Sequence, residues 1–200
     1  MTATAPDDGR LAPADLLSLE QYARVRTEFR TRAIEHRCRR TVAVGPSTTW
    51  CFEDRLTVQY QVQEMLRVER IFEPGAIQDE LAAYNPLIPD GANLKATLLI
   101  EFVDPVERAA ALARLKGIER RCHLAIGDQV CYAIADEDLE RENETKTSAV
   151  HFLRFEISAQ ARRLLAAGAP LRAGIDHPAY THSVELAAPA RAALAADLSV

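Results

Sequence analysis

Two of the five histidines in this 200-residue sequence stand where an imidazole could take part in chemistry. His151 lies in an apolar run with Leu153 and Phe155, where a ring that titrates needs a hydrogen-bond partner. His177 stands in the sequence Asp-His-Pro, a turn in which the neighbouring carboxylate could orient or ionise the ring. Both are candidates for a catalytic acid or base. The simpler alternatives are a hydrogen-bonded core histidine at 151 and an ordinary turn at 177.

A second set of candidates lies on a predicted helix that begins at Asp54. Glu64 and Arg67 are three residues apart, and so are Arg67 and Arg70, which makes their side chains neighbours on the helix surface. On a face turned to solvent they form ordinary ion pairs, each contributing a few tenths of a kcal/mol, roughly. On a face buried against a sheet and turned toward His151 they form a site, with Glu64 as acid or base and the arginines binding an anionic substrate.

Charged residues also share faces of two predicted strands. Lys95 and Glu101 lie on one face of the first strand, and Arg154 and Glu156 lie on one face of the second. Salt bridges on the solvent side of a sheet are the simple explanation. The alternative is that Lys95, Arg154 and Glu156 contribute to binding a substrate.

A metal site is a further hypothesis. Glu64, Glu101 and His151, if they converge, would supply the carboxylate and imidazole ligands that iron or zinc accepts. No spacing between these residues in the sequence demands such a site.

Predicted helices make up the first part of the chain, and one of them carries Glu64, Arg67 and Arg70. Ser18 and Gln21 form a capping box that begins a helix rich in arginine, and Asp54 caps a second helix. Pro74 begins a third, which must end before Pro86. A fourth helix begins at the sequence Asp-Pro-Val-Glu at 104–107.

Strands are predicted where apolar residues alternate or gather between turns. A hairpin over 41–52 turns at residues 45–48, and another over 122–134 turns at Gly127-Asp128. Further strands are expected at 94–102, 149–156, 171–175 and 180–186. Tight hairpins require antiparallel neighbours, so we predict an α+β fold. It has an antiparallel or mixed sheet with helices packed on one side and a helical N-terminal region.

The same pattern predicts the domain organisation. Residues 1–14 are expected to be a disordered tail, and residues 15–198 a single α+β domain with a mainly helical part at 15–86 and a sheet part at 94–186. Residues 136–144 are so acidic that we expect an exposed loop, and the stretch from Arg24 to Arg40 is basic. Either segment could meet a partner; a solvated surface is the simpler interpretation.

The composition and the motifs argue against several classes of protein. A net charge of −5 offers no general attraction to nucleic acid. The four cysteines form no C-x-x-C pair, and we interpret them as reduced thiols. There is no phosphate loop, dinucleotide fingerprint, H-E-x-x-H or G-x-S-x-G motif. With no signal peptide and no long apolar run, we expect a cytoplasmic protein that does not enter a membrane.

Several long runs resemble the domain of unknown function 3501 family of bacteria, over residues 16–198. They are YQVQEMLR (60–67), YNPLIPDG (84–91), LKAT with IE (94–97, 100–101), YAIADEDLER (132–141), KTSAVHFLRFE (146–156) and GIDHP (174–178). The family carries no established activity. The genes of its members look to lie near genes for rubrerythrin-like proteins and iron–sulphur oxidoreductases. The resemblance therefore implies an accessory role in iron-dependent redox or peroxide-stress metabolism.

Three functions follow as hypotheses. The first is an accessory or binding protein for a small ligand or for a rubrerythrin-like or iron–sulphur partner. The chain lacks the clustered cysteines that would hold an iron–sulphur centre of its own. The second is a metal-dependent or acid/base enzyme acting on a small anionic substrate, and the third is a homodimeric scaffold.

Overall fold

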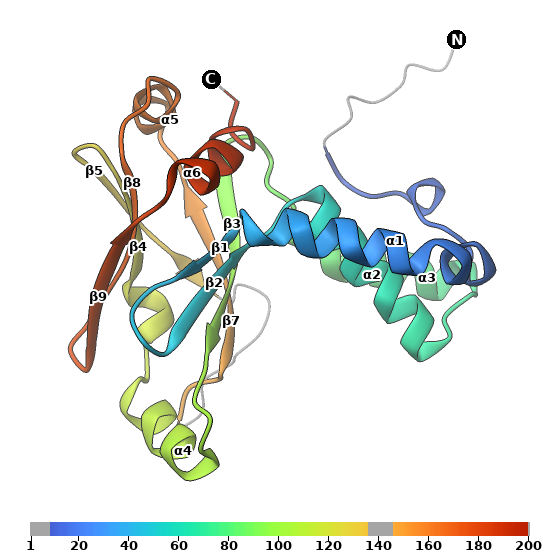
Figure 1. The fold of residues 1–200 in the computed structure, drawn as a ribbon, viewed down its shortest axis with the longest axis horizontal. Helices are drawn as coiled ribbons and strands as arrows, with labels where there is room; N and C mark the ends of the chain where they lie inside the picture. Colours follow the sequence, from blue (N-terminus) through green and yellow to red (C-terminus); the bar gives the residue numbers. More distant parts are fainter. Residues whose placement is uncertain (1–8, 136–145, 200) are drawn as a thin grey trace.

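The computed structural model describes residues 9–135 and 146–199 and shows a helical part beside two sheets (Figure 1). The helices are α1 (Leu19–Cys38), α2 (Arg55–Glu69), α3 (Pro74–Tyr84), α4 (Pro105–Arg114), α5 (Ala159–Ala166) and α6 (Ala188–Ala195), with 3-10 turns η1 (Pro13–Asp15), η2 (Asn85–Leu87) and η3 (Ile118–Arg121). The strands are β1 (Thr41–Ala43), β2 (Thr48–Phe52), β3 (Asn93–Ile100), β4 (Cys122–Ile126), β5 (Gln129–Tyr132), β6 (Ile134–Ala135), β7 (Val150–Glu156), β8 (Leu171–His177) and β9 (Tyr180–Glu185).

The described strands form two antiparallel sheets. Sheet A has the order β1-β2-β3-β7-β6, and sheet B has the order β5-β4-β8-β9. The predicted α+β class, the antiparallel pairing and the helical N-terminal region are therefore confirmed. The sequence pattern led us to expect one sheet; the structure has two because β4 and β8 pair with each other and not with β3 or β7.

The main core lies between the two sheets. The inward residues of β3, such as Leu98, share one buried cluster with Leu124 of β4 and Ile175 of β8. Trp50 of β2 stacks on Phe155 of β7 with ring centroids 5.5 Å apart. Burying each such side chain stabilises the fold by about 1.5–3 kcal/mol, so this double layer is the rigid body of the molecule.

The helices begin where the capping residues predict. The Ser18 hydroxyl accepts the N–H of Gln21 at the start of α1, and the Asp54 carboxylate accepts the N–H of Thr57 at the start of α2. Asp104 does the same for the first turn of α4. Among the described residues, no helix has the length and apolar character needed to cross a membrane.

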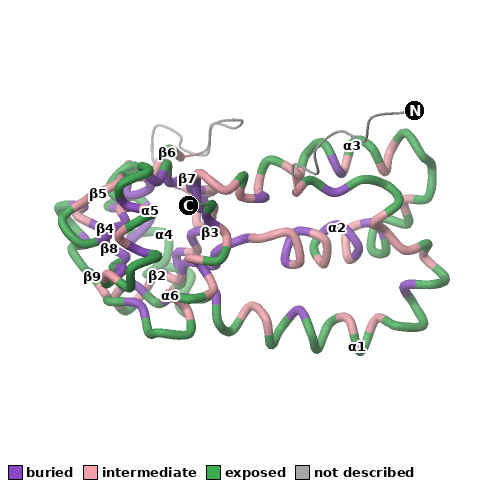
Figure 2. The backbone as a smooth tube through the Cα atoms, turned by 90° about the horizontal axis from the view of Figure 1, so that it is seen from above, coloured by how far each residue is buried: buried purple, intermediate pink, exposed green. Residues whose placement is uncertain are grey.

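The helical part is built from α1 and from an insertion within sheet A. Strands β2 and β3 pair directly, yet α2 and α3 lie between them in the sequence. These two helices share a small core of their own, which includes Val62, Leu66 and Leu81. Helix α1 buries only Tyr22 and Ala33 along its 20 residues, so it runs beside α2 largely exposed (Figures 1 and 2).

Glu64 of α2 connects this helix to α1 through hydrogen bonds and an ion pair. Its carboxylate accepts hydrogen bonds from Nε and Nη2 of Arg26 at 2.8 and 2.9 Å and from the Tyr22 hydroxyl at 2.6 Å. Arg67 adds a third partner at 3.1 Å. The hydrogen bonds from Arg26 hold the pKa of Glu64 at about 2, whereas burial raises the pKa of Tyr22 above its ordinary value.

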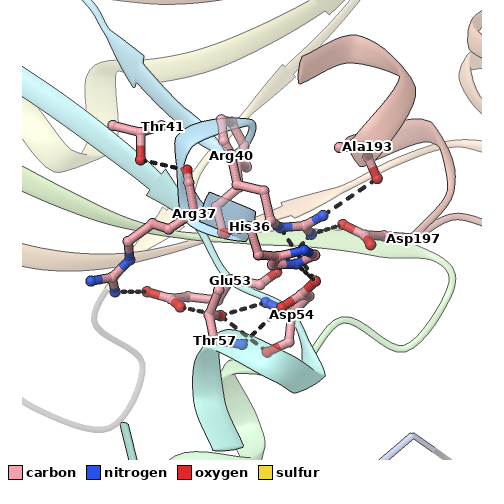
Figure 3. Close-up of polar contacts among 10 residues, drawn as sticks. His36, Arg37, Arg40, Thr41, Glu53, Asp54, Thr57, Ala193 and Asp197 are labelled. Atoms are coloured by element: carbon pink, nitrogen blue, oxygen red, sulfur yellow. Dashed lines mark hydrogen bonds and ion pairs between the residues drawn. The ribbon is translucent and has the colours of Figure 1, made fainter. Parts of the chain in front are cut away.

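A buried arginine joins the helical part to the sheets. Arg40, at the turn between α1 and β1, is 2% exposed and forms ion pairs with Asp54 and Asp197. Its guanidinium also donates to the carbonyl oxygens of Phe52 at 3.2 Å and Glu53 at 3.3 Å (Figure 3). The sequence suggested an exposed basic segment here, but the structure buries this member of it.

We expect Arg40→Met to lower the free energy of unfolding by about 3–5 kcal/mol, because it leaves the carboxylates of Asp54 and Asp197 without their buried cation. Arg39→Met is the matched control: the neighbouring arginine is exposed, and its loss should change the free energy by less than about 0.5 kcal/mol. Urea unfolding of both variants measures the difference. Equal effects would contradict the role given to Arg40.

Glu64 makes stability depend on pH. Its pKa falls from an ordinary 4.5 to about 2 on folding, so its contribution is complete above pH 4.5 and is lost as the pH falls toward 2. The difference in unfolding free energy between wild type and Glu64→Gln should therefore shrink across this window. Arg26→Gln, which removes the main cause of the shift, should weaken the same pH dependence. A dependence that survives intact in both variants would argue against this account.

Candidate functional site

The structure does not bring Glu64 and His151 together. The carboxylate of Glu64 points from α2 to Tyr22 and Arg26 of α1. His151 lies opposite Leu98 on the inner face of sheet A and is 0% exposed. Because side chains alternate across a strand, the ring shares its face with Leu153 and Phe155 and turns to the core. The predicted polar face of α2 therefore belongs to the contact between two helices.

Hydrogen bonds hold both predicted histidines in place. Nε2 of His151 lies 2.9 Å from the Thr147 hydroxyl and 3.1 Å from the Ser148 carbonyl oxygen. Nδ1 of His177 accepts the N–H of Ala179 at 3.2 Å, so its Nε2 carries the proton and donates to the Lys116 carbonyl at 3.0 Å. The contacts of His151 fit the simpler interpretation, a hydrogen-bonded core histidine. His177, the last residue of β8, is buried and joins the turn after this strand to Lys116, 61 positions away.

Among the other predicted site residues, Lys95, Arg154 and Glu156 lie together on the outer face of β3 and β7, whereas Arg70 and Glu101 lie apart from them. Lys95 lies opposite Arg154 across β3 and β7, and Arg154 pairs with Glu156. Arg70 is the exposed, left-handed C-cap of α2, and Glu101 accepts the Thr49 hydroxyl at 2.6 Å.

The expected metal site is not assembled. Over residues 9–135 and 146–199, no three His, Cys, Asp or Glu side chains gather closely enough to hold an ion, and this applies to Glu64, Glu101 and His151. The four cysteines are free thiols, as expected. The acidic segment at 136–144 lies outside the described residues.

A cavity does exist, on the outer face of sheet A where the helical part begins. Its volume is about 280 Å³. The residues that line it come from α1, β2, α2, α3, η2, β3 and β7 and are Arg37, Cys51, Glu53, Val58, Gln61, Tyr84, Leu87, Thr97, Leu99, Val150 and Phe152. Elements far apart in the sequence therefore meet at one concave site.

Sheet A forms the floor of the cavity. Cys51, Thr97 and Phe152 lie in one row across β2, β3 and β7, and Leu99 and Val150 lie side by side in the next row. Side chains alternate between the two faces of a strand. The residues on the inner face of these strands therefore fill the core, and those on the outer face line the cavity. Burial raises the pKa of the Cys51 thiol, which keeps it neutral.

Glu53 supplies the buried charge of the cavity. It follows β2 directly, and its side chain is 8% exposed. One carboxylate oxygen accepts the Thr57 hydroxyl at 2.6 Å and the other accepts the Thr97 hydroxyl at 2.7 Å. Nη2 of Arg37 lies 3.9 Å from the second oxygen, and this arginine is 41% exposed (Figure 3).

No pattern in the sequence pointed to Glu53, Arg37, Cys51 or Thr97 as site residues. One signal was present: Glu53 is a charged residue between an apolar strand and the helix cap Asp54. Because this junction is so short, the side chain of Glu53 must stay close to the sheet. The inserted helices that close the cavity come from a long-range arrangement that this local signal does not contain.

Comparison with known proteins agrees with the fold. A crystal structure of a protein of unknown function from Burkholderia pseudomallei is 51% identical to this chain, with a TM-score of 0.90, and the match covers 94% of this chain and 99% of that chain. No curated protein matches the sequence. The sequence profile of the family described as "Protein of unknown function (DUF3501)" matches residues 10–198, and the chain therefore belongs to that family.

Proposed function

We propose that this protein is a non-catalytic binding protein whose cavity between sheet A and the helical part holds a small, largely apolar molecule. The observation that carries the proposal is the cavity of about 280 Å³, lined mostly by apolar side chains and containing one buried carboxylate. Ligand sites are concave and mostly apolar, with volumes of roughly 300–1,000 Å³ and a few fixed polar groups, so this cavity lies at the lower limit and suits a small ligand.

The packing around the cavity supports recognition. Its floor consists of paired strands that are also part of the main core, so the shape exists before a ligand arrives. The Glu53 carboxylate is already oriented by two hydroxyl groups, and the neutral Cys51 thiol adds no second charge. A preformed site loses less conformational entropy on binding.

Leu99→Trp tests the cavity directly, because the larger ring fills space above the floor. We expect 2-phenylethanol to bind the wild-type protein saturably in an NMR titration and to bind Leu99→Trp at least about tenfold more weakly, a change of about 1.4 kcal/mol. Val130→Trp is the control, since this exposed residue of sheet B lies outside the cavity. The proposal fails if both variants bind the alcohol as the wild type does.

The resemblance to the family supports a second, broader proposal. Ligand binding would serve a cytoplasmic accessory role in iron-dependent redox or peroxide-stress metabolism, beside a rubrerythrin-like or iron–sulphur oxidoreductase. The exposed arginines of α1, such as Arg24 and Arg32, offer a basic surface for an acidic partner.

We expect such a partner to co-purify with the tagged chain from a native host extract at low salt. Replacing Arg24 and Arg32 by glutamine should reduce the recovered partner several-fold, and so should raising the salt concentration, because both weaken attraction between exposed charges. Mass spectrometry of the eluate measures this. Recovery of no iron-dependent redox protein from peroxide-treated cells would count against the role.

A further inference from the structure

We propose that Glu53 makes the cavity selective for a molecule that carries a primary ammonium group at one end of an apolar body. This inference rests on the proposed binding function and names the chemical class of its ligand. It follows from three properties of the site: the burial of the Glu53 carboxylate, the lone pairs that remain on it, and the position of the nearest cation.

The carboxylate is buried and rigid. The side chain of Glu53 is only 8% exposed, although its charge favours water. Its main chain is fixed on both sides, because its N–H donates to the Lys95 carbonyl at 2.9 Å and its carbonyl accepts Nη2 of Arg40 at 3.3 Å. To turn out to solvent, the carboxylate would have to give up its hydrogen bonds from the Thr57 and Thr97 hydroxyls.

The carboxylate has acceptor capacity left. Two oxygens offer about four lone-pair directions, and the hydroxyls of Thr57 and Thr97 use one on each oxygen. Thr57 is itself fixed, since its hydroxyl oxygen accepts the N–H of Asp54 at 2.9 Å. The remaining directions suit an ammonium group, which has three hydrogen-bond donors and a full positive charge.

Arg37 is not a hydrogen-bond donor to the Glu53 carboxylate. Its Nη2 stays 3.9 Å from the carboxylate, beyond hydrogen-bond distance, and its side chain is 41% exposed against 8% for Glu53. The guanidinium thus lies on the solvent side of the cavity, and the carboxylate lies on the protein side. A ligand cation would make short, desolvated contacts that the arginine does not make.

The rest of the cavity suits the apolar part of such a molecule. Leu99, Val150 and Phe152 form a continuous apolar floor next to Thr97, the residue that donates to Glu53. An amine that contacts the carboxylate at one end can therefore lie along this floor. A volume of about 280 Å³ suits a small molecule, such as a single ring with a short chain.

Three probes that share a phenylethyl body and differ in the polar end group separate the possibilities: 2-phenylethylamine, 2-phenylethanol and 3-phenylpropanoate. We expect the amine to bind wild-type protein at least about tenfold more tightly than the alcohol and the carboxylate to bind least, as calorimetry or NMR titration would show. In Glu53→Gln the preference for the amine should disappear while binding of the alcohol remains.

Arg37→Gln decides the question if Glu53→Gln does not fold, because Arg37 is half-exposed and can be replaced safely. It should leave amine binding equal or tighter, since it removes a competing cation. Tightest binding of 3-phenylpropanoate, lost in Arg37→Gln, would overturn the inference by making Arg37 the anchor. Equal binding of amine and alcohol would also overturn it while leaving the binding function intact; failure of all three probes to bind would remove both.

Discussion

A guanidinium with almost no access to water determines how the two parts of this molecule meet. Arg40 can stay buried only if its charge and its donors are satisfied, and two regions far apart in the sequence satisfy them. One is the junction of β2 and α2 at residues 52–54, and the other is α6 with the segment that follows it. The arrangement fixes α1, the inserted helices and sheet A relative to one another. The cavity lies in the angle between these elements, so its shape depends on the same buried cation.

The junction around residues 52–54 connects stability with the site. The carbonyl oxygens of Phe52 and Glu53 and the carboxylate of Asp54 all contact Arg40. The side chain of Glu53 instead points toward Arg37 and Thr57 (Figure 3) and lines the cavity. His36 completes the cluster, with its Nε2 2.5 Å from the Asp54 carboxylate. Main-chain atoms of residues 52 and 53 and the side chain of Asp54 thus hold the structure, and the side chain of Glu53 in the same short segment is left for binding.

Local chemistry made much of the fold predictable. The Ser18 and Asp54 caps and the Gly127-Asp128 hairpin act over a few residues, and each is found where the sequence indicated it. The division into two sheets was not predictable in this way, because it depends on which distant strands pair. Periodicity likewise showed that Glu64 and Arg67 are neighbours, but it could not show that their partner is α1 and not the sheet.

The candidate site was harder to predict for the same reason. His151 attracted notice as a titratable group in an apolar run, and the structure accounts for it with a local threonine and a carbonyl oxygen. Glu53 and Arg37 look like ordinary surface charges in the sequence. Their different burial becomes visible only when the insertion between β2 and β3 folds back over the outer face of sheet A.

The ion pair between Arg40 and Asp197 also has a consequence for how the chain matures on the ribosome. The two residues are 157 positions apart, and at about 5–20 residues per second the ribosome needs roughly 8–30 s to make the second after the first. During that interval the guanidinium lacks one of its two carboxylates, so the angle between helices and sheets is set late, after most secondary structure has formed.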